Sequence, residues 1–130
     1  MIKVQLLDQG DGTFAVVQGR FASAPPMADQ ATVSNVFTDW LGSILDTLHT
    51  ASVSYTIKNT GANSITWQVL AANLADFSDS VVVKAGAAVA AAASDTYLAN
   101  PAPYRFYKVQ IEDTVNGNHG TAHGAGITKG

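Results

Sequence analysis

The side chains best suited to chemistry lie near the C-terminal end of the chain. His119 and His123 are four residues apart. On an extended strand such residues share a face but stand about 13 Å apart, which is too far for one metal ion unless the chain bends at Gly120. A zinc site needs a third ligand, and the chain has neither cysteine nor an HExxH motif. We therefore predict no metal site and expect both histidines to be exposed beside a Gly-rich turn.

The carboxylates do not form an evident catalytic pair. Glu112 and Asp113 are adjacent, so on a strand they point to opposite faces and cannot flank one glycosidic bond. Asp76 and Asp79 fall in a polar loop beside Phe77 and are expected to be solvated. The chain also lacks the GxSxG, GxGxxG and GxxxxGK[ST] motifs. We predict a protein that is not an enzyme, with no catalytic residue and no cofactor.

The composition indicates one domain with a weakly charged surface. Hydrophobic residues make up 47% of the 130 residues, charged residues only 13%, and the net charge is −3. Lys and Arg are scattered, which argues against binding to a phosphate backbone. The longest apolar run, Ala85–Ala93, is too short to cross a bilayer. Few charges would have to be desolvated where neighbouring subunits pack, so assembly is favoured over a monomer with a polar coat.

The stretch Ser52–Leu70 carries the strongest structural pattern. Apolar residues alternate with polar ones on both sides of the polar loop Asn59–Asn63. This pattern predicts two strands joined as a β-hairpin, with Trp67 facing the core. The residues expected on the buried faces are Val53, Tyr55, Ile57, Ile65, Trp67 and Val69.

A second strand pair is predicted near the C-terminus. The strand Arg105–Asp113 is followed by the turn Asn116–Asn118 and by a Gly-rich returning strand at Thr121–Thr128. Short strands about ten residues apart predict an all-β fold, a single antiparallel β-sandwich or a jelly-roll-like barrel. The residues expected to face inward are Tyr107, Val109 and Ile111.

Tyr104 and Phe106 are expected on the opposite face from these three residues. Aromatic side chains that stay exposed often mark interfaces, so both are candidates for contact with a subunit or a ligand.

Two stretches remain ambiguous. Residues 31–50 carry apolar side chains near helical spacing but also β-branched residues, and Gly42 interrupts a long helix. We expect a strand at 31–38 and then an irregular or short helical turn at 39–48. Ala85–Ala93 has helix-favouring alanines but lies between strand patterns. We favour a strand whose small side chains let sheets or subunits approach closely.

Residues 1–26 are predicted to form a hairpin arm and linker that precede a sandwich domain at 27–130. Alternating residues flank the turn 8–12, which lacks the ligand spacing and terminal Glu of a calcium loop. The Pro25-Pro26 pair favours extended geometry, so the arm could reach a neighbouring subunit or cross to another edge of the same sandwich. The candidate interface residues are Ile2, Val4, Leu6, Phe14, Val16, Pro25, Pro26, Tyr104 and Phe106.

The motifs NTGANSITWQV and YRFYKVQIEDTVNGNHGTA, within Ser52–Thr128, resemble the small β-sandwich structural proteins of tailed bacteriophage virions. The resemblance implies a non-enzymatic virion protein that is made in the host cytoplasm, most directly a capsid decoration or cement protein. Its implied partners are further copies of itself, as in a trimer, and the major capsid protein or another virion protein, with no nucleic acid and no membrane.

Other roles remain open on the same fold. A carbohydrate- or receptor-binding module of a phage tail or fibre would need a solvent-exposed aromatic strip that includes Tyr104 or Phe106. A head–tail connector or another tail component would share the sandwich.

Overall fold

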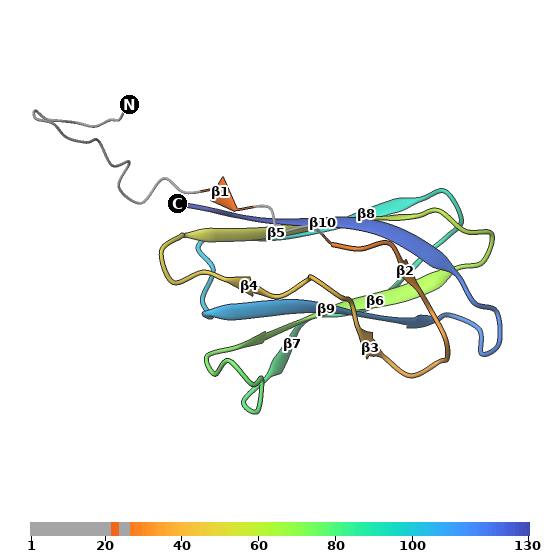
Figure 1. The fold of residues 1–130 in the computed structure, drawn as a ribbon, viewed down its shortest axis with the longest axis horizontal. Coiled ribbons are helices and arrows are strands. Elements are labelled where there is room, and N and C mark those ends of the chain that lie inside the picture. The colour runs from red at the N-terminus through yellow and green to blue at the C-terminus, as the bar shows by residue number, and fades with distance from the viewer. Residues whose placement is uncertain (1–21, 24–26) are drawn as a thin grey trace, which may run out of the picture.

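The structure is a computed structural model that describes residues 22–23 and 27–130. The expectations for Ile2, Val4, Leu6, Phe14, Val16, Pro25 and Pro26 lie outside these residues. The described chain is all β, with two antiparallel sheets packed face to face, so the predicted β-sandwich is confirmed (Figure 1). No helix in the described part of the chain is long and apolar enough to cross a membrane.

The first sheet, called sheet 1, has the strand order β1–β10–β5–β8, with β2 also paired to β10. All its pairings are antiparallel. Its strands are β1 (Ala22–Ser23), β2 (Gln30–Ala31), β5 (Ser52–Asn59), β8 (Ser94–Ala99) and β10 (Thr121–Lys129). The short β1 lies inside the predicted linker and pairs with the end of β10.

The second sheet, called sheet 2, has the order β3–β9–β6–β7, with β4 also paired to β9. Its strands are β3 (Thr38–Asp39), β4 (Leu45–Asp46), β6 (Ile65–Ala72), β7 (Val81–Val89) and β9 (Phe106–Asp113). If β1/β2 and β3/β4 are each taken as one interrupted strand, each sheet has four strand positions. This is the strand order of a jelly roll.

The core lies between the sheets and follows the alternation of the sequence. Trp67 is 0% exposed, as its place between Ile65 and Val69 predicts. The predicted inward residues of β9 and those of β5 are also fully buried: Val53, Tyr55, Ile57, Tyr107, Val109 and Ile111. Period-two burial therefore identified the inner faces of the long strands correctly.

The predicted hairpin at Ser52–Leu70 is wrong in its pairing. Its two strands exist, but β5 belongs to sheet 1 and β6 to sheet 2, so residues 60–64 cross between the sheets. Asn59 shapes this crossing because its side-chain amide donates to the Asn63 and Val89 carbonyls, at 2.8 and 2.9 Å. Its Oδ1 also accepts from the Gly61 N–H, at 2.9 Å. A hairpin and a crossing share the same alternation and the same turn residues, so the sequence does not separate them.

The turn at Asn116–Asn118 is not a hairpin either, because it joins β9 of sheet 2 to β10 of sheet 1. Among the described strands, β6 and β7 are the one consecutive pair that hydrogen-bonds to each other. In each crossing the two joined strands lie in opposite sheets, and each strand still buries one face against the other sheet.

Neither ambiguous stretch forms a helix. The predicted strand at 31–38 is wrong over most of its length, because only Ala31 and Thr38 are in strands. Residues 39–48 hold β4 and an irregular turn, without the short helix that was one alternative. The favoured strand at Ala85–Ala93 is confirmed as far as Val89, where β7 ends.

Candidate interaction surface

Residues 31–50 run along one side of the sandwich, from β2 on sheet 1 to β3 and β4 on sheet 2 (Figure 1). Trp40 and Leu45 of this segment are core residues, but elsewhere in it the usual burial is inverted, since Ser43 and Thr47 are buried while Ile44 is 56% exposed. The segment holds five of the ten exposed large hydrophobic residues in the described chain. We call these five the side strip: Val33, Val36, Leu41, Ile44 and Leu48.

The buried hydroxyls attach this segment to sheet 2. The Val109 N–H donates to Ser43 Oγ at 3.0 Å, and Thr47 Oγ1 donates to the Tyr104 carbonyl at 2.7 Å. β3 and β4 each pair over only two residues, so hydroxyls replace part of the missing backbone ladder. Ser43 and Thr47 therefore face inward together with Leu45, and Ile44 and Leu48 are left facing solvent.

Trp40 anchors the middle of the segment. Its ring is 1% exposed, and its Nε1–H donates to the Ala28 carbonyl at 2.6 Å. The ring packs on Gly124 of β10, where an added Cβ would lie 2.9 Å from the ring atom Cζ2. The glycine in the thin last strand therefore makes room for the indole that fixes this side of the sandwich.

A tight turn carries one member of the side strip outward. The Ser43 N–H donates to the Trp40 carbonyl at 3.2 Å, and Gly42 has a φ of 79°. A four-residue turn with glycine in the left-handed region at its third position holds Leu41 beside it, at the tip. Leu41 is 67% exposed although the residue before it is core.

Two ion pairs border the side strip on the outer face of sheet 2. Asp39 lies 3.1 Å from Lys108, and Asp46 lies 3.1 Å from Arg105. Burial opposes ionisation of Asp39, but hydrogen bonds from Gln110 and Lys108 outweigh it and lower the pKa of Asp39. The Arg105 hydrogen bond likewise lowers the pKa of Asp46. Both carboxylates are therefore charged at neutral pH, and their side chains remain 54% and 44% exposed.

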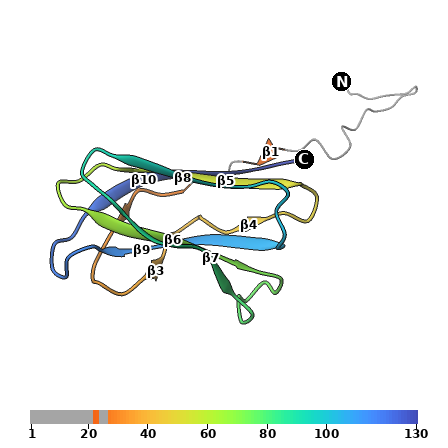
Figure 2. The ribbon, with the colours of Figure 1, turned by 180° about the vertical axis from the view of Figure 1, so that it is seen from behind.

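The opposite side of the sandwich, where β7 and β8 are the edge strands, is built differently (Figure 2). Lys84 of β7 lies 3.4 Å from Asp95 of β8, so one ion pair links the two sheets. The Trp67 Nε1–H donates to Asp95 Oδ2 at 2.9 Å, and the Lys84 Nζ sits 5.1 Å from the centroid of the indole ring. We call these three residues the charged clasp. Inward-pointing charges of this kind discourage a foreign strand from pairing with an edge.

The aromatic residues expected at an interface are half-buried in the structure. Tyr104 does not lie on the face opposite Tyr107, because the strand begins at Phe106 and the alternation does not extend back to Tyr104. Its ring packs edge-on against Tyr107, with centroids 6.5 Å apart. Phe106 does lie on the outer face, where Phe77 is 6.3 Å away and the Arg105 guanidinium 4.8 Å away.

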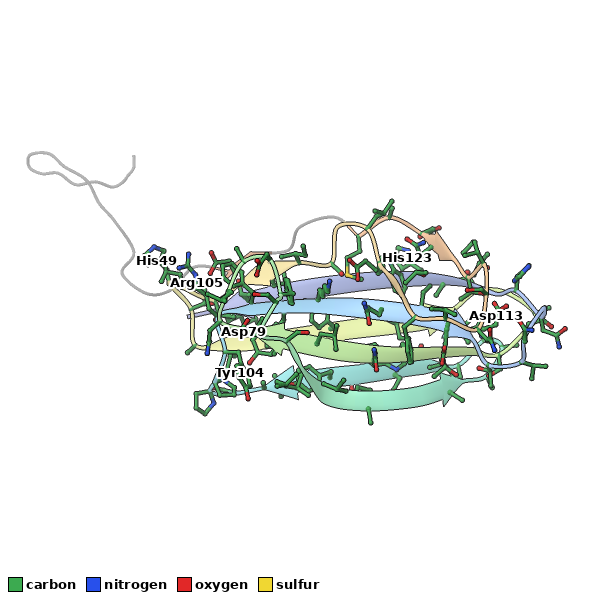
Figure 3. The ribbon with its side chains drawn as sticks, turned by 90° about the horizontal axis from the view of Figure 1, so that it is seen from below. His49, Asp79, Tyr104, Arg105, Asp113 and His123 are labelled. Carbon is green, nitrogen blue, oxygen red and sulfur yellow. The ribbon has the colours of Figure 1, made fainter. Side chains whose placement is uncertain are left out.

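The histidines are exposed as expected, but each has an acidic partner. His119 Nδ1 lies 2.9 Å from Asp113, and His123 Nδ1 lies 2.7 Å from Asp29. Glu112 and Asp113 face opposite sides of β9, as predicted, since only Asp113 is buried. Figure 3 shows Asp113 at one end of the sandwich and Arg105 and Tyr104 at the other. Within residues 22–23 and 27–130, no three His, Cys, Asp or Glu side chains form a group that could hold a metal ion.

Sequence reasoning missed the side strip. The alternation of Ser43, Leu45 and Thr47 with Ile44 and Leu48 is visible in the sequence. Apolar residues are normally assigned to the inside, so the pattern suggests a core segment rather than an exposed surface. One sequence signal could have revealed the strip. It is the regular alternation of hydroxyl residues with apolar residues in a segment that lacks room for full strands.

Comparisons with known proteins give structural likenesses but no family. No protein-family model matches the chain, and no curated protein matches it. The crystal structure of PirA is similar, with 15% sequence identity over 89% of this chain and 97% of that chain, and a TM-score of 0.43.

Proposed function

We propose that this chain is a non-enzymatic structural protein of a tailed-phage virion, and specifically a capsid decoration protein that cements neighbouring capsomers as a homo-oligomer. The observation that carries the proposal is the side strip, which offers exposed apolar side chains along one whole side of the sandwich. The motif resemblance across Ser52–Thr128 supplies the virion context. The jelly-roll order adds only an analogy of fold, because such folds occur in viral capsids and also in other proteins.

The side strip supports assembly for an energetic reason. Burying apolar surface gains about 25 cal/mol per Å², and the isolated chain leaves this gain unused at Leu41, Ile44 and Leu48. Residues 31–50 contain no Lys or Arg, and both carboxylates in the segment already have cationic partners. A protein surface can therefore cover the strip without burying an unpaired charge.

Binding to phage heads tests the proposal directly. Heads of the phage that encodes the chain, assembled without it, should bind the purified protein saturably in co-sedimentation. The double variant Leu41→Asp/Ile44→Asp should lose most of this binding. The matched control, Val115→Asp, alters a residue that is 57% exposed but outside the strip, and it should bind like the wild type. Heads that bind neither wild type nor control, together with an image of the virion that lacks the chain, would rule out the structural role.

The proposed arm has a separate test. Deleting residues 1–26 should weaken oligomerisation or head binding while the sandwich stays folded by circular dichroism. A truncated chain that assembles and binds heads normally would show that the arm makes no contact. A virion image with the chain at the neck, tail or fibre would replace the decoration role by one of those positions.

A further inference from the structure

We propose that Asn116 is a site of spontaneous covalent modification, where the side-chain amide is converted to a carboxyl group through a cyclic imide formed with the backbone nitrogen of Gly117. Water is the only co-reactant, and ammonia is released. The modification is independent of the virion role proposed above, because it requires no partner protein.

The sequence distinguishes Asn116 from the other asparagines. The chain has seven asparagines, and Asn116 is the one followed by glycine. Glycine has no Cβ, so its backbone nitrogen is the least crowded and the peptide before it rotates most freely. A proline offers no N–H, which excludes attack after Asn100. Asn116 is therefore the asparagine expected to react first. The remaining asparagines are followed by larger side chains: Asn35, Asn59, Asn63, Asn73 and Asn118.

The structure places Asn116 in an open turn after Asp113, at one end of the sandwich (Figure 3). The Asn118 N–H donates to the Val115 carbonyl at 2.9 Å, and Gly117 has a φ of 88°. Asn116 and Gly117 thus occupy the middle of a four-residue turn, and both are exposed. A Cβ added at Gly117 would meet no atom within 4 Å. The peptide between the two residues therefore has room to rotate and to bring its nitrogen to the Asn116 side chain.

One weak contact restrains the attacking nitrogen. The Gly117 N–H donates to Asp113 Oδ2 at 3.3 Å, which is long for such a bond. The same oxygen lies 2.9 Å from His119 Nδ1. The nitrogen can leave Asp113 at a small cost, because the histidine still contacts the carboxylate.

The covalent step balances without an oxidant or a reductant. The Gly117 nitrogen attacks Cγ of Asn116, and the new C–N bond closes a five-membered ring. The bond from Cγ to Nδ2 breaks, and the proton lost by the Gly117 nitrogen leaves with Nδ2 as ammonia. Water then opens the imide at one of its two carbonyl carbons. The products are aspartate, with the original backbone, and isoaspartate, in which the backbone runs through Cγ.

The isoaspartate product should weaken this end of the sandwich. The Asp113 side chain is 0% exposed, and its Oδ1 has no hydrogen-bond partner among the residues that the structure describes. Its Oδ2 therefore depends on Gly117 and His119. A backbone lengthened by one carbon before Gly117 moves the N–H away, and the buried carboxylate loses a donor. The modified chain also gains a negative charge in the turn that follows Asp113.

Mass spectrometry of the full chain tests the proposal. The purified protein is incubated in water labelled with heavy oxygen, at mildly alkaline pH, until a synthetic peptide of residues 113–120 is fully converted. Digestion and fragmentation should then locate one heavy oxygen and the change from amide to carboxyl at Asn116, with isoaspartate as the main product. Asn118 is the matched control, because it is exposed in the same turn and is followed by His119, and it should remain unmodified.

Two variants separate the cyclic route from simple exposure. Gly117→Ala should lose most of the modification over the same period. Asn116→Gln should lose all of it, because the longer side chain does not form the five-membered ring. The melting temperature of the wild type should fall on ageing, whereas that of Asn116→Gln should not.

Three outcomes would overturn the modification site. They are a folded wild type that stays unmodified when the peptide has reacted, equal modification of Asn118, and an unchanged rate in Gly117→Ala. A modified wild type that melts like aged Asn116→Gln would overturn the effect on stability.

Discussion

The two sides of the sandwich close the same core in opposite ways. On the β7–β8 side, Lys84 and Asp95 form an ion pair above Trp67 and link the sheets through charge. On the β2–β4 side, the chain is tied to sheet 2 through the buried hydroxyls of Ser43 and Thr47. The first side is spanned by the charged clasp, although Val81, Val82 and Leu98 of its edge strands are also exposed, and the second side exposes the side strip.

This difference teaches how one fold can leave its two sides with different surface chemistry. Both sides contain edge strands, which can pair with other chains unless they are guarded. The charged clasp guards one side because a docking partner would have to desolvate its ions. The side strip is bordered by two ion pairs but presents five exposed apolar side chains, so the two sides of the fold offer different surfaces to solvent.

The largest effect should come from removing the indole ring of the charged clasp. Trp67→Ala should lower the free energy of unfolding by about 3–5 kcal/mol, because it leaves a cavity and removes the donor to Asp95. Urea titration followed by circular dichroism measures the change. A loss below about 1 kcal/mol would show that the β7–β8 side does not depend on this ring.

On the strip side a serine is buried and an isoleucine is exposed. We therefore expect the serine substitution to cost more stability than the isoleucine substitution. Ser43→Ala should cost about 1–3 kcal/mol because it leaves the buried Val109 N–H without its partner. Ile44→Ser should stay within about 0.5 kcal/mol of wild type because Ile44 is exposed. The same titration compares them, and an apolar substitution costlier than the hydroxyl deletion would contradict the assignment.

The stability that the charged clasp contributes should depend on pH at values below the ordinary carboxyl pKa. Burial opposes ionisation of Asp95, but hydrogen bonds from Trp67 and the Thr96 N–H, together with Lys84, lower the pKa of Asp95 below its ordinary value of 3.8. A lowered pKa adds stability that is present above the unfolded pKa and is lost as the pH falls through the folded one.

Asp95→Asn should therefore cost about 0.5–1 kcal/mol at pH 7, and the difference from wild type should shrink below pH 3.8. Unfolding free energies of both proteins at several pH values measure it. Lys84→Gln serves as the control for loss of the ion pair alone, and a difference that does not vary with pH would exclude a charge effect.

The smallest effect on folding should come from the tip of the side strip. Leu41→Ser should change the free energy of unfolding of dilute, monomeric protein by less than about 0.5 kcal/mol, because Leu41 is 67% exposed. Thermal unfolding at low concentration checks this. A loss above about 1 kcal/mol would mean that Leu41 belongs to the core and that the strip is structural.

The accuracy of sequence-based prediction differs between these regions for a physical reason. Long strands such as β5, β6 and β9 follow a period of two because one face is buried, and Trp67 was placed correctly on that ground. Strand partners were not predictable, because the turn after Asn59 suits a hairpin as well as a crossing between sheets. Tyr104 was misplaced because alternation holds only within a strand.

The sequence by itself determined the all-β class, the inner faces of the long strands and the scarcity of charge. Tertiary structure alone decided which strands share a sheet and which apolar side chains remain exposed. Side-chain alternation is a local consequence of backbone geometry, whereas pairing depends on contacts between distant segments. Ile44 is exposed because Ser43 must satisfy Val109, which lies 66 residues away along the chain.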